Sequence, residues 1–219
     1  MSDTLPLVSC IMPTYNRHNY MLRSIKYFLN QDYPNKELII VDDTSIDLKI
    51  NNFEKSIKYL HYNKKYNVGK KRNIAIQNAK GSIIMFWDDD DIYANDRINV
   101  QVSDIISKKC DITVFNNIYY HINNKLYITD KKTHENIWYN GYACGTLTFR
   151  KSITNKCKFK NINLAEDVTF LKCALEKGYK LHTLKNNYKF VYTKHSNNTF
   201  VFDAKFKQIR MPKKIENLI

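Results

Sequence analysis

Four consecutive aspartates are the part of the sequence best suited to chemistry. Asp88–Asp91 follow directly on the apolar run 82–87, and carboxylates this close raise one another's pKa unless a cation lies among them. Alternate side chains of an extended chain share a face, so Asp88 and Asp90 are expected on one side and Asp89 and Asp91 on the other. Such a carboxylate pair suits Mg²⁺ or Mn²⁺, with substrate phosphates completing the coordination.

An acidic surface turn is the simpler alternative, with Asp91 or Asn95 capping a following helix. An ordinary turn rarely needs four aspartates, so we favour a metal site. Asp42 and Asp43 follow a second apolar run, 37–41, although Asp-Asp-Thr-Ser also suits a turn. Because open α/β sheets bind ligands beyond the carboxyl ends of their strands, both acidic groups are expected at one shared site.

Short strands and helices alternate through the first half of the chain. Apolar runs predict strands over 7–12, 37–41, 56–62 and 82–87, the first ending at Pro13. Helical spacing of apolar residues predicts helices over 19–30 and 67–78. This alternation implies right-handed βαβ crossovers. The fold class is therefore α/β, with a mostly parallel central sheet flanked by helices.

The second half is less regular. Strands are expected over 111–120, 125–128, 142–150 and 188–193, and a helix over 164–177. Residues 200–219 form a basic tail to which no structure is assigned. A chain of 219 residues corresponds to one domain.

Composition and charge narrow the class of protein. Hydrophobic residues make up 43% of the chain and aromatic residues 13%, which excludes a disordered protein. The net charge of +14 attracts anions, but the lysines are scattered apart from one dense tract at 64–72, so a solvated basic surface explains it equally well. The longest apolar run is far shorter than the ~18 residues of a membrane span. No secretory signal is recognised, and five widely spaced cysteines favour a reducing compartment; we expect a cytoplasmic protein.

Two common nucleotide-binding motifs are absent from the sequence. There is no Gly-x-x-x-x-Gly-Lys-[Ser/Thr] loop and no Gly-x-Gly-x-x-Gly fingerprint. A P-loop nucleotidase and a Rossmann dehydrogenase both lose support. A metal held by aspartates and bridging a diphosphate remains.

Four segments, in order and at matching spacing, resemble the inverting family 2 glycosyltransferases of the GT-A fold. Residues 8–17 are similar to the opening strand of that family, 37–45 to its second strand, 67–73 to its Asn-x-Gly…Ala-Arg-Asn segment and 86–91 to its DxD motif. Residues 145–150 and the Glu166-Asp167 pair resemble its acceptor side. The resemblance implies a Rossmann-like nucleotide-sugar-binding half over about 5–110 and a mixed acceptor-binding half over about 111–199.

The resemblance also implies roles for single residues. Thr14 and Tyr15 would line the base pocket with Asn16 and Arg17 beside them, and Asp43 would accept a hydrogen bond from the base. Arg72 would lie near the base or diphosphate, Asp89 would contact the ribose, and Asp88 and Asp90 would hold the metal and diphosphate. His195 is placed, more weakly, near the metal. The run of four aspartates leaves the metal ligands ambiguous by one position.

Asp167 resembles the family's catalytic base. Inverting transfer is one in-line displacement, so one carboxylate suffices. The alternative from local pattern is a capping box of Asn163 with Glu166, followed by acids in the first turn of a helix. With the resemblance, we expect Asp167 as base and Glu166 as cap. Trp138, in a polar loop, is a candidate for stacking on an acceptor sugar, whereas Trp87 is expected in the core.

The predicted function is a metal-dependent inverting glycosyltransferase that uses Mn²⁺ or Mg²⁺ and a nucleotide-sugar, with UDP as the default nucleotide. Its acceptor is a glycan, a protein or a lipid. A nucleotidyltransferase or other phosphotransfer enzyme with the same carboxylates, and a non-catalytic polyanion-binding protein, are the alternatives. Nucleic acid is not an expected partner, because acidic strand ends repel it. The basic tail could meet anionic lipid, although a solvated terminus is the simpler interpretation.

Overall fold

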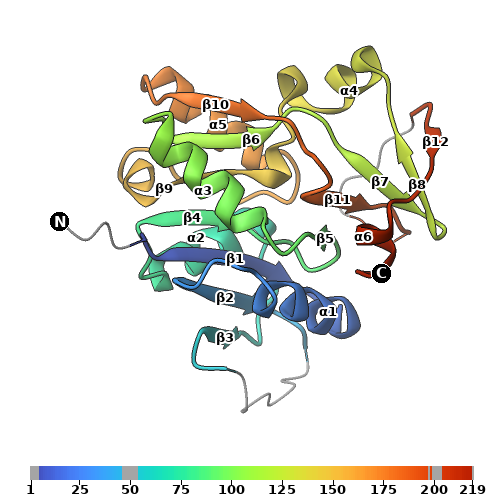
Figure 1. The fold of residues 1–219 in the computed structure, drawn as a ribbon. Coiled ribbons are helices and arrows are strands. Elements are labelled where there is room, and N and C mark those ends of the chain that lie inside the picture. The colour runs from blue at the N-terminus through green and yellow to red at the C-terminus, as the bar shows by residue number, and fades with distance from the viewer. Residues whose placement is uncertain (1–4, 46–53, 197, 199–203, 219) are drawn as a thin grey trace.

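The computed structural model describes residues 5–45, 54–196, 198 and 204–218. One sheet runs through the molecule (Figure 1). Its strands are β1 (Val8–Thr14), β2 (Lys36–Asp42), β3 (Ile57–His61), β4 (Ile83–Phe86), β6 (Ile112–Phe115), β9 (Thr148–Arg150) and β10 (Leu181–Leu184). These seven strands are ordered β10-β6-β9-β4-β1-β2-β3. β1 pairs in parallel with β2 and β4, β2 with β3, and β6 with β10, while β9 lies antiparallel between β4 and β6. The expected α/β fold with a mostly parallel sheet is confirmed.

Helices cover both faces of this sheet because alternate strand residues point to opposite sides. Cys10 and Met12 of β1 belong to the core cluster that includes α1 (His18–Leu29) and α3 (Arg97–Ser107). Ile11, between them, belongs to the opposite cluster, which includes α2 (Val68–Asn78) and α5 (Glu166–Glu176). The central strands are therefore apolar on both faces, which explains their uninterrupted apolar runs.

A smaller sheet lies beside the first. It contains β5 (Ile92–Tyr93), β7 (Tyr119–Ile122), β8 (Lys125–Ile128), β11 (Phe190–Thr193) and β12 (Lys207–Ile209), in the order β12-β8-β7-β11-β5. The short helices are α4 (Lys131–Ile137) and α6 (Lys213–Glu216), and 3₁₀ turns occupy Tyr139–Gly141, Cys144–Thr146 and Lys151–Asn155. Among the described residues no helix is both long enough and apolar enough to cross a membrane.

The first strand continues through Pro13, where the sequence predicted its end. Ile11 accepts a backbone hydrogen bond from Trp87 on the β4 side. Pro13, two residues on, faces the same side, but β1 pairs with β4 only as far as Ile11. The missing N–H of Pro13 therefore costs no ladder bond, and β1 remains paired with β2 up to Thr14.

Three further expectations are corrected. The strand expected over 111–120 is divided into β6 and β7, and within 142–150 only 148–150 is a strand, because 3₁₀ turns precede it. The tail is not a solvated terminus in its described part: β12 pairs with β8, and Ile215 of α6 is fully buried. Residues 200–203 and 219 lie outside the described part of the chain.

The cysteines divide into two groups. Cys157, before α5, and Cys173, within α5, form a disulfide. The odd number and wide spacing of the five cysteines did not predict this pairing. Cys10, Cys110 and Cys144 are free and buried, and behave as small apolar side chains. The pairing runs against the reducing environment expected from the cysteine spacing.

Candidate active site

A cavity of about 880 Å³ opens at the carboxyl ends of β1 and β4. Its lining includes residues 14–17, 88–91, 135–140 and 163–168. The predicted residues that line it are Thr14, Tyr15, Asn16, Arg17, Arg72, Asp88, Asp89, Asp90 and Asp167. Asp43 and His195 do not line it, but each contacts a residue that does. The acidic strand ends therefore converge on one cavity, as parallel pairing requires.

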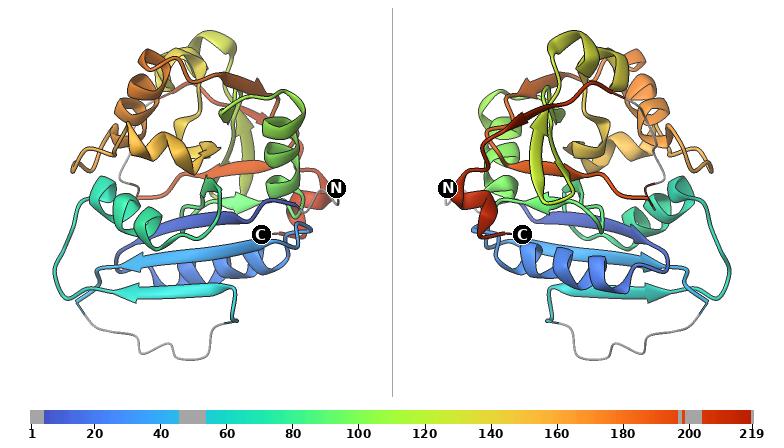
Figure 2. Two further views of the ribbon diagram at one scale, coloured as in Figure 1. Left: turned by 90° about the vertical axis from the view of Figure 1, so that its left-hand side faces the viewer. Right: turned by 90° about the vertical axis from the view of Figure 1, so that its right-hand side faces the viewer.

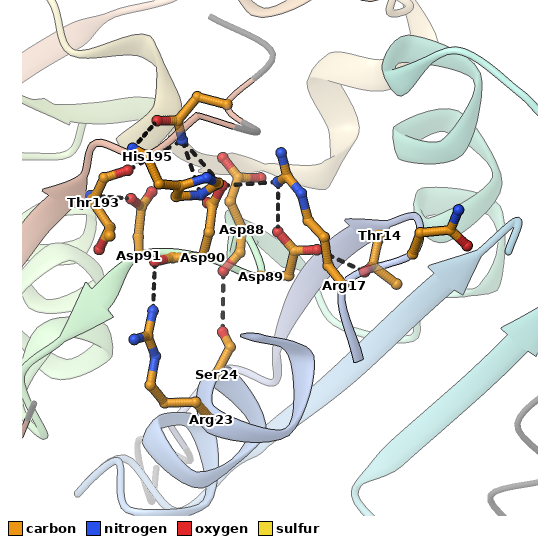
Figure 3. Close-up of polar contacts among 12 residues, drawn as sticks. Thr14, Arg17, Arg23, Ser24, Asp88, Asp89, Asp90, Asp91, Thr193 and His195 are labelled. Atoms are coloured by element: carbon orange, nitrogen blue, oxygen red, sulfur yellow. Dashed lines mark hydrogen bonds and ion pairs between the residues drawn. The ribbon is translucent and has the colours of Figure 1, made fainter. Parts of the chain in front are cut away.

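The four aspartates do not alternate between two faces, because the chain leaves β4 at Phe86 and turns (Figure 3). Asp89 and Asp90 both contact the guanidinium of Arg17, at 3.0 and 2.8 Å from Nη1. Asp88 instead lies 3.1 Å from Nη1 of Arg72. The expected pairing of Asp88 with Asp90 on one side is therefore not seen.

Asp89 is held deeply in this loop. The hydroxyl of Thr14 donates to Asp89 Oδ2 at 2.6 Å, and Arg17 occupies the other oxygen. Burial, with a smaller contribution from Asp90, raises the pKa of Asp89 to about 7, against the lowering effect of Arg17. Asp89 thus joins the end of β1 to the acidic loop.

Asp90 is the carboxylate with the most diverse partners. Its Oδ2 lies 3.1 Å from Nε2 of His195, and the side-chain amide of Asn198 donates to the same oxygen at 3.3 Å. The ring of His195 stacks on Tyr20, with centroids 4.8 Å apart. His195 is therefore brought to the acidic loop, as the sequence analysis expected.

Asp91 has a structural role. Its Oδ1 accepts a hydrogen bond from the backbone N–H of Thr193 at 2.9 Å. Burial, together with Asp90 and Asp88, raises the pKa of Asp91 well above its usual range. This contact attaches the acidic loop to β11 and so positions His195, two residues after Thr193.

Asp42 and Asp43, the second acidic pair, have different roles: Asp42 stabilises a turn, and Asp43 contacts a residue that lines the cavity. Asp42 accepts from the backbone N–H of Thr44 at 2.9 Å and from the hydroxyl of Tyr59 at 2.8 Å, which is turn chemistry. Asp43 is buried and accepts from Nζ of Lys71 at 2.8 Å and from the backbone of Tyr66 at 2.6 Å.

Lys71 belongs to the site although the sequence analysis did not single it out. Its ammonium also donates to the backbone oxygen of Thr14 at 2.9 Å and lies 6.0 Å from the ring centroid of Tyr15. The Nζ of Lys65 lies 4.1 Å over the same ring. The available signal for Lys71 was its place in the basic tract beside Arg72, but that tract was interpreted as a solvated surface.

Arg72, which lines the cavity, contacts the first turn of α5. Its Nε donates to Oε1 of Glu166 at 3.1 Å. Burial alone would lower the pKa of Arg72, but Asp88 and Glu166 outweigh it and raise that pKa. Glu166 is therefore an ion-pair partner and not a helix cap: the N-cap of α5 is Ala165, without a side-chain bond, and Asn163 instead accepts from the backbone of Val68.

Asp167 faces the cavity beside this ion pair. Burial, reinforced by Glu166 and opposed by Arg72, raises the pKa of Asp167 to about 7. A carboxylate with a pKa near neutrality suits proton transfer at neutral pH. Trp138, also in the wall, is almost fully buried and donates its indole N–H to the hydroxyl of Tyr120 at 2.9 Å.

The donor set was tested for a divalent cation. No group of three or more His, Cys, Asp or Glu side chains suited to a metal ion occurs among the described residues. Asp90 and His195, however, present an oxygen and a nitrogen 3.1 Å apart at the cavity end. This pair fits a site with two protein ligands, in which substrate oxygens supply the remaining positions.

Sequence comparisons now identify what this chain is similar to. Residues 9–169 match the profile of the family described as Glycosyl transferase family 2. A protein of Haemophilus influenzae described as an uncharacterized glycosyltransferase is 31% identical over 183 residues, 78% of this chain and 73% of that protein. The Escherichia coli UDP-Glc:alpha-D-GlcNAc-diphosphoundecaprenol beta-1,3-glucosyltransferase WfgD is 29% identical over 215 residues, 93% of this chain and 83% of that protein.

Structural comparisons agree on the fold. TarS 1-349 of S. aureus in complex with UDP-GlcNAc has a TM-score of 0.69 at 21% identity, over 88% of this chain and 60% of that one. The mannosyltransferase PcManGT of Pyrobaculum calidifontis, in complex with GDP-Man and Mn²⁺, has a TM-score of 0.65 at 17% identity, over 88% and 57%. The chain thus spans about 60% of the length of TarS 1-349.

Proposed function

Because this chain belongs to glycosyltransferase family 2 and has the GT-A fold, we propose that it transfers a sugar from a UDP-sugar to an acceptor hydroxyl, with inversion and with a divalent cation. Membership of the family decides among the three activities considered from the sequence in favour of glycosyl transfer. One observation carries the finer proposal: a single cavity is lined by both the acidic loop and Asp167.

The donor end would hold the nucleotide and its diphosphate. Tyr15 would lie against the base, with Asn16 beside it and Asp43 as acceptor for the base, and Asp89 would contact the ribose. Asp90 and His195 would hold Mn²⁺ or Mg²⁺, with Asp88 as the third candidate. When bound, the cation supplies positive charge that stabilises the leaving nucleoside diphosphate. Two neighbours support this assignment, because one is a complex with UDP-GlcNAc and another a complex with GDP-Man and Mn²⁺.

At the acceptor end, Asp167 would act as general base. It would accept the proton of the acceptor hydroxyl while that oxygen bonds to the anomeric carbon. The bond from that carbon to the diphosphate oxygen breaks in the same step, and the nucleoside diphosphate leaves. Arg72 pairs with Glu166 and Asp88, and would thereby hold Asp167 and the acidic loop in fixed positions relative to each other.

The acceptor is proposed to be lipid-linked. WfgD, which matches 93% of this chain, is named for an acceptor attached to diphosphoundecaprenol. The other classes, a free glycan or a protein, are distinguished by assaying transfer to each. A cytoplasmic location stays part of the proposal, although the Cys157–Cys173 disulfide runs against it.

A thermal-shift panel of nucleotide-sugars, each with and without Mn²⁺, tests the donor assignment. A ligand at a hundredfold excess over its Kd stabilises the native state by about 2.7 kcal/mol. In a domain of this size that corresponds to a rise in Tm of several degrees. We expect a rise with a UDP-sugar that requires Mn²⁺ and is lost in Asp90→Ala. A rise that persists with a chelator and in Asp90→Ala would contradict the metal assignment, and no rise with any nucleotide-sugar would contradict the donor site.

A further inference from the structure

Two large apolar side chains stand exposed at the acceptor end of the cavity. Leu164 is 55% exposed and lines the cavity, and Ile162 is 38% exposed. Both lie in the segment that leads into α5, just before Asp167. Exposed apolar side chains that lie together beside a site and are rimmed by polar residues mark an interaction surface.

The segment is held in place by α2. The backbone N–H of Gly69 donates to the oxygen of Ile162 at 3.1 Å, and that of Val68 donates to Oδ1 of Asn163 at 3.1 Å. The side-chain amide of Asn67 donates to the oxygen of Asn161 at 2.5 Å. Figure 2 shows this segment beside α2 at one side of the molecule. The exposure of Ile162 and Leu164 is therefore a property of the folded surface.

Exposed lysines lie on the same segment and on the helix that holds it. Lys158 and Lys160 are exposed on the same segment, in alternation with the buried Cys157 and Phe159. Lys70 is exposed on the first turn of α2, next to the residues that bind the segment. We call Lys70, Lys158, Lys160, Ile162 and Leu164 the acceptor rim.

We propose that the acceptor rim docks on an anionic membrane surface. Ile162 and Leu164 would enter the boundary between head groups and acyl chains, and the three lysines would meet anionic head groups. The inference rests on the proposed function, because it brings the mouth of the cavity to a surface that holds a lipid-linked acceptor. It adds the surface by which the enzyme reaches that acceptor.

The tail is a weaker candidate for the same partner. Lys205, Lys207, Arg210, Lys213 and Lys214 are all exposed. The apolar side chains of that region, however, pack on the core: Ile215 is buried and Phe206 and Leu218 lie against it. The tail thus offers charge without an apolar anchor. Nucleic acid is a poorer match for the acceptor rim, because single-stranded binding uses aromatic platforms and the rim presents aliphatic side chains.

Vesicle co-sedimentation of the full chain tests the proposal, with phosphatidylglycerol–phosphatidylcholine vesicles against pure phosphatidylcholine. We expect binding to the anionic vesicles only. The double variant Ile162→Asp/Leu164→Asp should bind at least about tenfold more weakly. Lys158→Glu/Lys160→Glu should bind more weakly by about fivefold or more for each lysine. Two controls should bind like the parent: Ile106→Asp, 48% exposed on α3 at the other face of the sheet, and Lys205→Glu/Lys207→Glu on the tail.

Each outcome is decisive when the Tm of every variant matches that of the parent. Equal binding of rim variants and parent overturns the proposal, as does loss of binding in the tail variant alone. Single-stranded RNA that binds more tightly than vesicles, with no effect of Ile162→Asp/Leu164→Asp, overturns it in favour of nucleic acid. The thermal shift caused by a UDP-sugar with Mn²⁺, measured on the Lys158→Glu/Lys160→Glu variant, separates the two proposals. If the variant keeps this shift and the parent does not bind vesicles, the acceptor-rim proposal is overturned and the proposed function is not.

Discussion

Arg72 is the side chain that joins the two ends of the site. Its guanidinium contacts Asp88 and Glu166 and lies 3.7 Å over the ring of Phe86, fully enclosed. One buried cation therefore balances carboxylates from the acidic loop and from α5. Removing it would leave the buried carboxylate of Glu166 unpaired, which is more costly than losing the pair itself.

Asp167→Asn tests the catalytic base. The amide has nearly the same shape but cannot accept the proton, so we expect the UDP-sugar thermal shift to persist while kcat falls by about 10²–10⁴. Normal transfer by this variant would contradict the assignment. Asp88→Asn, at the other end of the ion-pair network, is the matched control and should affect donor binding as well.

The pH dependence of kcat/KM tests the same group. This ratio reports the free enzyme, in which the pKa of Asp167 is raised to about 7. A base acts when deprotonated, so activity should be half-maximal near pH 7, approach its full value about one unit above it and fall about tenfold per unit well below it. A profile that is flat down to pH 5 would show that the ionisation of Asp167 does not limit transfer.

Arg17→Ala should strengthen binding of Mn²⁺. Arg17 bridges Asp89 and Asp90, and a divalent cation must compete with it for the carboxylate of Asp90. We expect the Kd for Mn²⁺, measured by electron paramagnetic resonance, to fall by about fivefold, or roughly 1 kcal/mol. Arg23→Ala is the matched control, because Arg23 donates to the backbone oxygen of Asp90. Unchanged or weaker Mn²⁺ binding in Arg17→Ala would count against this competition.

At the residue level, the sequence could predict side chains that belong to local motifs. Thr14, Arg17 and the four aspartates lie in such motifs and are brought together in the structure, although the expected alternation of the aspartates is not seen. The partner of Arg72 could not be predicted, because Glu166 lies 94 residues away and its local pattern favoured a cap. Lys71 was passed over for a similar reason, since its charge alone does not show that it turns inward.

At the scale of elements, the contact of α2 with the segment before α5 sets the shape of the cavity. Gly69 is in the first turn of α2, and a Cβ added there would lie 1.8 Å from the backbone oxygen of Lys160. No L-amino acid with a side chain fits without moving one of the two segments.

Gly69→Ala should therefore destabilise the protein, although alanine favours a helix by about 1 kcal/mol over glycine. We expect a loss of at least about 1–3 kcal/mol, measured by urea unfolding. Lys70→Ala, exposed one residue on, is the control and should stay within about 0.5 kcal/mol. A neutral or stabilising Gly69→Ala would show that the segment yields at little cost.

Elements with strong local patterns were predictable, and those made by pairing were not. β2, β4 and α1 carry long apolar runs or helical spacing. β5 has two residues and β10 four, and β10 becomes a strand by pairing with β6. The helix α3 was missed although Ile98, Val102 and Ile105 recur at helical spacing. This helical spacing could have been recognised in the sequence, where it follows the run of four aspartates.

At the scale of the whole molecule, the basic tail completes the fold. β12 extends the smaller sheet, Ile215 is buried, and the hydroxyl of Tyr27 donates to the backbone oxygen of Leu218 at 2.5 Å. The tail thus attaches to α1 across the molecule. Its high lysine content hid this role, because the few apolar residues that anchor it are widely spaced.

Ile215→Ala should lower the free energy of unfolding by about 2–4 kcal/mol, as expected for a fully buried isoleucine. For a domain of this size each kcal/mol lowers Tm by about 2–4 °C. Calorimetry checks the change against Ile106→Ala, whose side chain is 48% exposed and should matter little. Similar Tm values for the two variants would mean that the tail contributes nothing to stability.

The antiparallel strand β9 has a consequence for the order of folding. The strands β1 to β4 all lie before residue 87, so β1 can pair with β2 and β4, and β2 with β3, before the rest of the chain is made. The sheet can extend to β6 and β10 only through β9, which arrives with residues 148–150. During synthesis the part of the sheet formed by β1 to β4 can therefore assemble as the ribosome releases it, whereas the cavity cannot form until β9 and α5 have been made. Such late, non-local contacts slow folding. The addition of β9, which completes the cavity, is therefore also the step before which the edge of β4 stays unpaired longest.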